Sequence, residues 1–217
     1  MSLAIFDLDD TLVDGDSSSM FLQYLVDAGL AAADMLAREA AMMADYRAGQ
    51  LGMEDYMLFT MQPLQGKSVQ EVATWTADYI QQRILPRLFP QALAALADYR
   101  AVGRRIVIIS ATGDHIVQPI ARALGVDDAL AIQLETREGC YTGRTRGTLT
   151  YQHGKVSRLH DWLAEQGETL ADSHGYSDSI NDVPLLEAVS QAHVVNPDAR
   201  LAAVAAERHW PQLAWAR

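Results

Sequence analysis

The sequence predicts an α/β protein whose core is a Rossmann-like, doubly wound and mostly parallel sheet, interrupted by an all-helical insertion. Three observations support this class. Residues 3–6 (LAIF) form a short apolar run that is typical of a buried strand. From Ser17 to about Leu85 the apolar residues follow helical spacing, whereas after Pro90 strand-like and helix-like patterns alternate. A chain of 217 residues with 49% apolar side chains can bury such a core.

The helical block directly follows the first strand. Asp16 and Ser17 are candidates for a helix N-cap, and the apolar residues after them lie on one helical face. We therefore expect a core of residues 1–14 and 89–217, and a helical insertion of residues 15–88. Further helices in the insertion are expected over 32–48, 53–61 and 68–85, separated by Gly49, Gly52, Pro63 and Gly66.

The second half of the chain alternates between strands and helices, which predicts parallel pairing with helices on both faces of the sheet. A Gly- and Thr-rich stretch over 136–153 is expected to form a solvated hairpin that carries Arg137, Arg144 and Arg146. Such sheets bind ligands beyond the carboxyl ends of their strands. The expected strands are 105–109, 131–135, 174–178 and 192–196, and the expected helices are 91–101, 114–124, 155–166, 180–189 and 198–207.

Composition excludes several classes of protein. The net charge of −11 and the absence of a Lys/Arg run argue against a non-specific nucleic-acid binder. No run of 18 apolar residues predicts a membrane span, and the N-terminus lacks the pattern of a signal peptide. Cys140 is the only cysteine, so a disulfide framework is excluded and a cytoplasmic location is expected.

The stretch IFDLDDTL at residues 5–12 ends a hydrophobic run with three carboxylates, Asp7, Asp9 and Asp10. Like charges this close destabilise one another unless a cation lies among them. In an extended segment Asp7 and Asp9 point the same way, which favours either a Mg²⁺ ion or an acid/base division of roles. The alternative is that Asp9 and Asp10 cap the following turn.

Polar residues also follow the second expected strand. Ser110 offers a hydroxyl, and the amides of Ala111 and Thr112 are expected to start a helix whose N-terminus favours an anion. Lys155 begins a later helix, where it is either solvated or neutralises a phosphoryl oxygen or clustered carboxylates.

The segment GYSDSINDVPLL at residues 175–186 supplies Asp178, Asn181 and Asp182. If Asp182 lies in the first turn of a helix, both carboxylates can face one cavity. Asp178 is then a candidate Mg²⁺ ligand, and Asp182 a candidate acceptor for Lys155. The alternative is an N-cap followed by an acid that favours the helix dipole.

Together, DLDDT, a Ser at the end of a strand, a Lys, and SDSINDVP resemble the four motifs of the haloacid-dehalogenase superfamily of aspartyl phosphatases, and most closely its phosphoserine-phosphatase-like branch. The helical insertion looks like the all-helical cap of that branch. The resemblance implies that Asp7 is the nucleophile and Asp9 the general acid and base, with Mg²⁺ held by Asp7, the carbonyl of Asp9, and Asp178. It also implies that Asp182 positions Lys155. The implied phosphoryl-binding residues are Asp10, Ser110, Ala111, Lys155 and Asn181.

The resemblance implies a small-molecule phosphomonoester as substrate, and the insertion bears on which one. Asp16 falls where the branch keeps an acid for a substrate ammonium group. Thr60 falls where it keeps an arginine for a substrate carboxylate, and Thr cannot supply a bidentate guanidinium. Arg47 is nearby in the sequence and is a candidate substitute. Phosphoserine is therefore not the expected substrate.

Other functions share these residues. A phosphotransferase would pass the phosphoryl group to an alcohol, and a receiver-like signalling module would keep it on Asp7. A silent binding protein would not need every charged motif residue, and a 2-haloacid dehalogenase would not need Asp9 as a proton shuttle. The leading hypothesis is a Mg²⁺-dependent phosphomonoester hydrolase whose insertion closes over the site.

Overall fold

A seven-stranded sheet forms the centre of the computed structural model, which describes residues 2–47, 52–126 and 128–217. The strand order is β4-β3-β2-β1-β5-β6-β7, and every neighbouring pair is parallel except β3 and β4. The predicted α/β class with a mostly parallel sheet is therefore confirmed. The strands are β1 (Leu3–Phe6), β2 (Arg105–Gly113), β3 (Asp128–Arg137), β4 (Cys140–Arg146), β5 (His174–Ser177), β6 (Gln191–Val195) and β7 (Gln212–Leu213).

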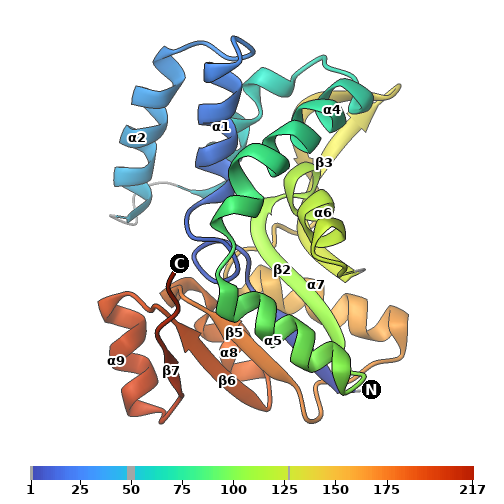
Figure 1. Ribbon diagram of the computed structural model, residues 1–217. Coiled ribbons are helices and arrows are strands. Elements are labelled where there is room, and N and C mark those ends of the chain that lie inside the picture. Colours follow the sequence, from blue (N-terminus) through green and yellow to red (C-terminus); the bar gives the residue numbers. More distant parts are fainter. Residues whose placement is uncertain (1, 48–51, 127) are drawn as a thin grey trace.

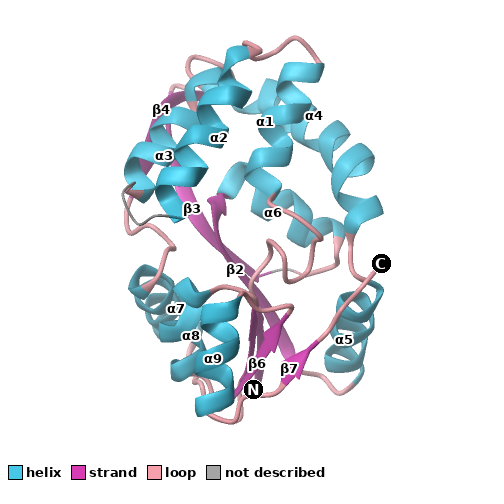
Figure 2. Ribbon diagram, turned by 90° about the vertical axis from the view of Figure 1, so that its left-hand side faces the viewer, coloured by secondary structure: helices cyan, strands magenta, loops and turns pink. Residues whose placement is uncertain are grey.

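Helices cover both faces of this sheet (Figure 2). Successive side chains of a strand point to opposite faces, so Phe6 packs in the cluster that contains Leu96 of α5, whereas Ile5 packs in the cluster that contains Leu159 of α7. Burial on both faces explains why β1 is apolar throughout. The helices are α5 (Pro90–Ala101), α6 (Asp114–Ala123), α7 (His153–Gln166), α8 (Val183–Ala188) and α9 (Ala199–Glu207), with a 3₁₀ turn, η4, over Ile180–Asp182.

The helical insertion lies above the carboxyl ends of β1 and β2 (Figure 1). Asp16 caps α1 by accepting from the Ser19 amide, and Ser68 and Glu71 form a capping box at the start of α4. The single helix expected over 68–85 is interrupted, because Pro86 lacks an amide hydrogen and cannot continue a regular helix. The elements are α1 (Ser17–Asp27), α2 (Asp34–Arg47), α3 (Met53–Thr60), η1 (Gln62–Leu64), α4 (Val69–Tyr79), a π-turn η2 (Ile80–Ile84) and η3 (Leu85–Arg87).

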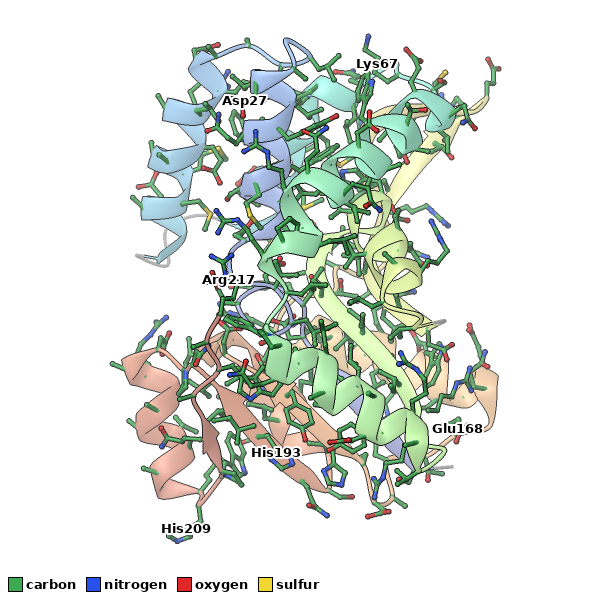
Figure 3. All side chains as sticks on the ribbon, in the orientation of Figure 1. Asp27, Lys67, Glu168, His193, His209 and Arg217 are labelled. Carbon is green, nitrogen blue, oxygen red and sulfur yellow. The ribbon has the colours of Figure 1, made fainter. Side chains whose placement is uncertain are left out.

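The two ends of the insertion lie side by side. Val13 and Leu88 form an antiparallel bridge, and the Asp14 amide donates to the Arg87 carbonyl at 2.8 Å. Arg217, labelled in Figure 3, donates to the Asp14 carboxylate at 2.6 Å and to the carbonyl that precedes Arg87 at 3.1 Å. The chain therefore leaves and re-enters the core at one place.

The hairpin of β3 and β4 is not a solvated arm, which corrects the prediction for 136–153. Its outer edge pairs with the insertion: the Gly66 amide donates to the Tyr141 carbonyl at 2.8 Å, and the Val69 amide to the Gly139 carbonyl at 2.9 Å. An edge strand presents unpaired backbone groups, and the extended segment before α4 satisfies them. The three arginines of the stretch are exposed, as expected: Arg137, Arg144 and Arg146.

None of the helices in the described ranges combines the length and the apolar composition that crossing a bilayer would require.

Candidate active site

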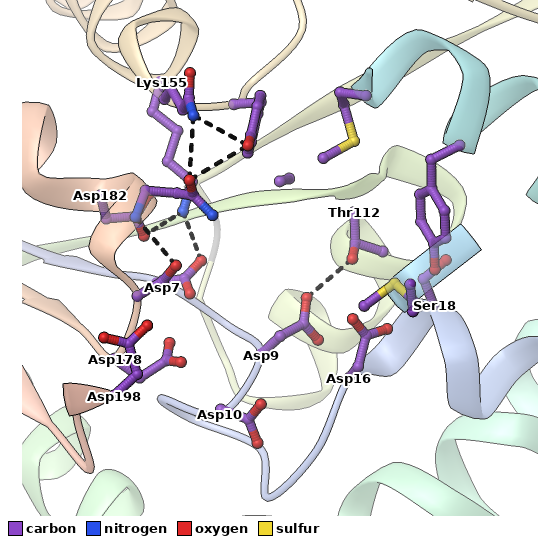
Figure 4. Close-up of a pocket in the computed structure, with 18 of the residues that line it drawn as sticks. Asp7, Asp9, Asp10, Asp16, Ser18, Thr112, Lys155, Asp178, Asp182 and Asp198 are labelled. Atoms are coloured by element: carbon purple, nitrogen blue, oxygen red, sulfur yellow. Dashed lines mark hydrogen bonds and ion pairs between the residues drawn. The ribbon is translucent and has the colours of Figure 1, made fainter. Parts of the chain in front are cut away.

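The acidic loop after β1 directs its carboxylates into a cavity at the carboxyl end of the sheet. The Asp7 amide extends the pairing with β5 by donating to the Tyr176 carbonyl at 2.9 Å. Leu8 is fully buried, so the alternation of the chain turns Asp7 and Asp9 to the opposite side (Figure 4). The Asp7 side chain is itself buried, with 6% of the residue exposed.

Lys155 is the cation beside Asp7. It extends from the first turn of α7, and its Nζ lies 2.8 Å from Asp7 Oδ1 and 2.6 Å from Asp182 Oδ2. Ser177 Oγ donates to the same Asp182 oxygen at 2.7 Å, which fixes that carboxylate. The structure thus brings together three of the residues predicted from sequence, although they come from three distant parts of the chain (Figure 4).

One lysine does not neutralise this site. Burial, and then repulsion from Asp182 and Asp9, raises the pKa of Asp7 to about 7 although Lys155 opposes the change. Burial lowers the pKa of Lys155, but the charges of Asp182 and Asp7 outweigh it and raise that pKa above its ordinary value. The lysine is therefore charged, and the site keeps an excess of negative charge.

Asp9 is held by donors on two sides. Its Oδ1 accepts from the Ser17 amide at 2.7 Å, and its Oδ2 accepts from Thr112 Oγ1 at 2.9 Å and from Ser110 Oγ at 3.4 Å. Burial, and then repulsion from Asp16, raises the pKa of Asp9 to about 6. A carboxyl group with this pKa can both give and take a proton near neutral pH.

Ala111 lines the cavity, and Ser110, which is fully buried, reaches it through its contact with Asp9. The helix expected over 114–124 begins at Asp114 as predicted, but no helix starts at the amides of Ala111 and Thr112. β2 continues to Gly113 with irregular register after Ile109, and α6 begins only at Asp114. The bulge changes the direction of the strand but does not end it. The amides of Ala111 and Thr112 therefore belong to a strand and not to a helix N-terminus.

Asp178 and Asn181 follow β5. Asp178 Oδ1 accepts from Thr11 Oγ1 at 3.1 Å. Burial, and then repulsion from Asp7 and other carboxylates, raises the pKa of Asp178 well above its usual range. Asn181 Oδ1 accepts from Tyr151 OH at 3.3 Å and from Gln152 Nε2 at 3.1 Å.

These residues fit a Mg²⁺ ion. In the described part of the chain, no group of three or more His, Cys, Asp or Glu side chains could hold a metal. The predicted donor set is different: two carboxylates, Asp7 and Asp178, with the main-chain carbonyl of Asp9. Mg²⁺ in proteins commonly takes one or two carboxylates and completes its shell with water and phosphate oxygens. The mutual repulsion of these buried carboxylates is what a divalent cation would relieve.

The cavity has a volume of about 530 Å³, and its far wall comes from the insertion. Asp10 and Asp16 line it, whereas Thr60 does not and instead donates to the Met57 carbonyl at 3.2 Å. Arg47 is the last residue of α2, and its side chain lies outside the described part. Residues that line the cavity and were not singled out from the sequence include Ser18, Tyr56, Tyr151, Gln152, Asp198 and Arg200. For Thr112 the sequence analysis named the amide, whereas it is the hydroxyl that reaches Asp9. Its spacing of two from Ser110 on a strand, which puts both side chains on one side, is the signal that could have indicated this.

Comparison with protein families identifies the chain. The sequence model of the haloacid dehalogenase-like hydrolases matches residues 4–187. The chain belongs to this family. This haloacid dehalogenase-like hydrolase is thus an enzyme of the class predicted from its four motifs.

Several known proteins are similar to this hydrolase. A histidinol-phosphatase of Neisseria meningitidis serogroup C (strain 8013) is 39% identical over 218 residues, which cover 98% of each chain. A phosphoserine phosphatase of Mycobacterium tuberculosis (strain ATCC 25618 / H37Rv) is 31% identical over 216 residues, covering 95% of this chain and 68% of the relative.

Solved structures share the fold. The crystal structure of a protein with unknown function from Bordetella pertussis Tohama I has a TM-score of 0.91 and 38% identity, covering 98% of this chain and 97% of the other. A phospho-aspartyl intermediate analogue of phosphoserine phosphatase has a TM-score of 0.71 at 18% identity, covering 100% of this chain and 94% of the other.

Proposed function

We propose that this hydrolase is a Mg²⁺-dependent phosphatase that cleaves a small-molecule phosphomonoester through an aspartyl-phosphate intermediate on Asp7. The observation that carries the proposal is the buried contact of Lys155 with both Asp7 and Asp182, at 2.8 and 2.6 Å, in the cavity into which Asp9 also points. The relatives named histidinol-phosphatase and phosphoserine phosphatase support the same class of substrate.

In the first step, a carboxylate oxygen of Asp7 attacks phosphorus and the ester P–O bond breaks. Asp9, whose pKa is about 6, gives its proton to the leaving alcohol oxygen. In the second step Asp9 takes a proton from a water molecule whose oxygen attacks the same phosphorus. The bond to Asp7 then breaks, phosphate leaves, and both carboxyl groups return to their starting states.

Charge neutralisation makes this attack feasible, because a phosphate dianion repels a carboxylate. Lys155 supplies one positive charge, and at about 4 Å one such charge contributes roughly 4 kcal/mol at an effective dielectric near 20. A Mg²⁺ ion held by Asp7, Asp178 and the Asp9 carbonyl would supply further positive charge against the phosphoryl oxygens. Ser110 and Asn181, with the amides of Asp10 and Ala111, are the proposed donors to those oxygens.

The far wall of the cavity indicates the kind of leaving group. Asp16 and Tyr56 line it, and no described lysine or arginine forms an ion pair with Asp16. The described part of that wall suits an ammonium group better than a carboxylate. We propose an amino-alcohol phosphate without a carboxylate, and histidinol phosphate, which the 39% identical relative is named for, has this chemistry.

We further propose that residues 15–88 act as a cap on a core of residues 1–14 and 89–217. The cap would close over the cavity, exclude bulk water from the aspartyl-phosphate, and contact the leaving group. The insertion lies above the carboxyl ends of β1 and β2 (Figure 1), and its residues Asp16 and Tyr56 line the cavity that also contains Asp7 and Asp9, which supports this role.

A substrate panel tests the proposal. Phosphate release from histidinol phosphate, phosphoserine, phosphoethanolamine and p-nitrophenyl phosphate would be measured with and without Mg²⁺. We expect metal-dependent release, a preference for the substrates that lack a carboxylate, and complete loss in Asp7→Asn. Asp98→Asn, on the exposed side of α5, is the matched control and should be fully active.

Two outcomes would redirect the assignment. Undiminished release by Asp7→Asn would exclude Asp7 as the nucleophile. A phospho-Asp7 that persists for hours would favour a receiver-like module, whereas transfer of phosphate to added alcohols in place of water would favour a phosphotransferase.

A further inference from the structure

Gln152 has a backbone conformation that favours glycine. It precedes the first residue of α7 with φ 50° and ψ −123°, and its side chain makes no capping hydrogen bond. A side chain at this φ is strained, and such strain persists only where the surrounding structure imposes it. A glycine would satisfy the turn at lower free energy. The presence of a long carboxamide therefore suggests that the side chain itself has a role.

The contacts on either side of Gln152 impose this conformation. On one side, Thr150 is fully buried and its hydroxyl donates to the Ser110 carbonyl at 2.6 Å, which pins the chain to the end of β2. On the other side, Gly154 packs so closely that a Cβ there would lie 1.9 Å from the Leu149 carbonyl oxygen. The turn between these anchors is short, and it delivers both Gln152 and Lys155 to the same cavity.

The Gln152 side chain joins the two walls of the phosphoryl site. Its Nε2 donates to Asn181 Oδ1 at 3.1 Å and to Tyr151 OH at 3.0 Å, and Tyr151 OH donates to the same Asn181 oxygen at 3.3 Å. One wall is the start of α7, which carries Lys155. The other is η4, which carries Asn181 and Asp182. The direct contact of Lys155 with Asp182 is therefore paralleled by a second contact between the same two elements.

We propose that Gln152 is a positioning residue that orients Asn181 toward the phosphoryl group. This inference rests on the proposed function. By donating to Asn181 Oδ1, it fixes the rotation of that carboxamide so that the amide end faces the phosphoryl oxygens. It also holds the amide at a constant distance from Lys155. The strained turn is therefore needed for catalysis, because a relaxed turn would move Gln152 Nε2 away from Asn181 Oδ1.

Two variants separate this role from a purely structural one. Gln152→Met keeps the length of the side chain and the strained turn but removes the donor. Gln152→Gly removes the donor and relieves the strain. We expect each to lower kcat about tenfold, the rate equivalent of roughly one hydrogen bond, with KM changed less than about twofold. Gln152→Gly should nevertheless melt at a higher temperature than the parent protein.

His209→Gly is the matched control. His209 is exposed, has φ 56°, and lies at the far end of the molecule (Figure 3). Its replacement should raise the melting temperature without changing kcat. If Gln152→Gly also keeps full activity, Gln152 is only a turn residue and the proposal is wrong.

A double-mutant cycle with Asn181→Ala completes the test. Because Gln152 acts through Asn181, Gln152→Met should add little to the loss already caused by Asn181→Ala. If the fold-losses in kcat of the two single variants multiply in the double variant, the proposal is wrong. Absence of phosphatase activity in the parent protein would instead reject the proposed function, so the two failures are distinguishable.

Discussion

Lys155 Nζ lies 2.8 Å from Asp7 Oδ1, although 148 positions separate the two residues in the sequence. Their side chains are 3% and 9% exposed, so the contact is shielded from solvent and from salt. The same ammonium group also contacts Asp182. One buried positive charge thus pairs with two carboxylates. The resulting excess of negative charge underlies the behaviour expected of the site.

Replacing Lys155 by Met should reduce kcat roughly a hundred- to a thousandfold, because about 4 kcal/mol of charge stabilisation is lost. It should also lower the free energy of unfolding by about 3 kcal/mol, since Asp7 and Asp182 become unpaired. The destabilisation should grow as pH rises, because the unpaired carboxyl groups then lose their protons. Urea unfolding at pH 5 and pH 8 would measure it, and Lys67→Met, at an exposed lysine, should unfold like the parent protein.

Thr112→Val should raise the pKa of Asp9 above its present value of about 6. The Thr112 hydroxyl donates to the Asp9 carboxylate at 2.9 Å and so favours the charged form, and the isosteric valine removes that donor. We expect the pKa of Asp9 to rise by about one unit, which corresponds to the loss of one hydrogen bond to a charged group. The pH dependence of kcat should therefore move upward, and a profile that coincides with that of the parent protein would contradict the acid/base role of Asp9.

Mg²⁺ affinity should fall as the solution is acidified. Burial raises the pKa of Asp7 to about 7, so below that pH a proton occupies a carboxylate that the ion needs. Displacing one proton weakens binding about tenfold per pH unit. Calorimetric titration at pH 5.5, 6.5 and 7.5 would measure this, and Asp178→Asn should show little binding at any of them. A dissociation constant that is independent of pH would refute the proposed ligand set.

The contact between the hairpin and the helical insertion can be tested with one proline. Val69 is the first residue of α4, where proline is well tolerated, but its amide donates to the Gly139 carbonyl at 2.9 Å. Val69→Pro should lower the free energy of unfolding by about 1 kcal/mol and speed amide exchange at Tyr141. Ala199→Pro, at the first position of α9, is the matched control for a proline at a helix start. Equal stability of both variants would show that the pairing contributes nothing.

Much of the core could be predicted from sequence because its signals are local. Alternating apolar strands and helices gave the class of the sheet, and the short spacing of Asp7 and Asp9 placed both carboxylates on one side. The contact of Lys155 with Asp182 was also anticipated, although it rests on a resemblance as much as on spacing.

The missed features depend on contacts between distant segments. Nothing near Gly66 or Tyr141 in the sequence indicates that they pair, because the pairing depends on where the insertion comes to rest. The continuation of β2 beyond the expected end at Ile109 to Gly113 likewise depends on its irregular pairing with β3. Gln152 looks like an ordinary surface residue until its backbone angles are known, and β7 is only two residues long.

The bridge between Val13 and Leu88 holds the two ends of the insertion next to each other. A segment that departs and returns through one point can be lengthened, shortened or exchanged while the strand order beneath it stays the same. We therefore propose that the reaction chemistry and the substrate selectivity reside in separable parts of one chain. Grafting a foreign segment between residues 17 and 88, which keeps the Ser17 amide that holds Asp9, should redirect the enzyme to other alcohols while the reactive carboxylates remain in place.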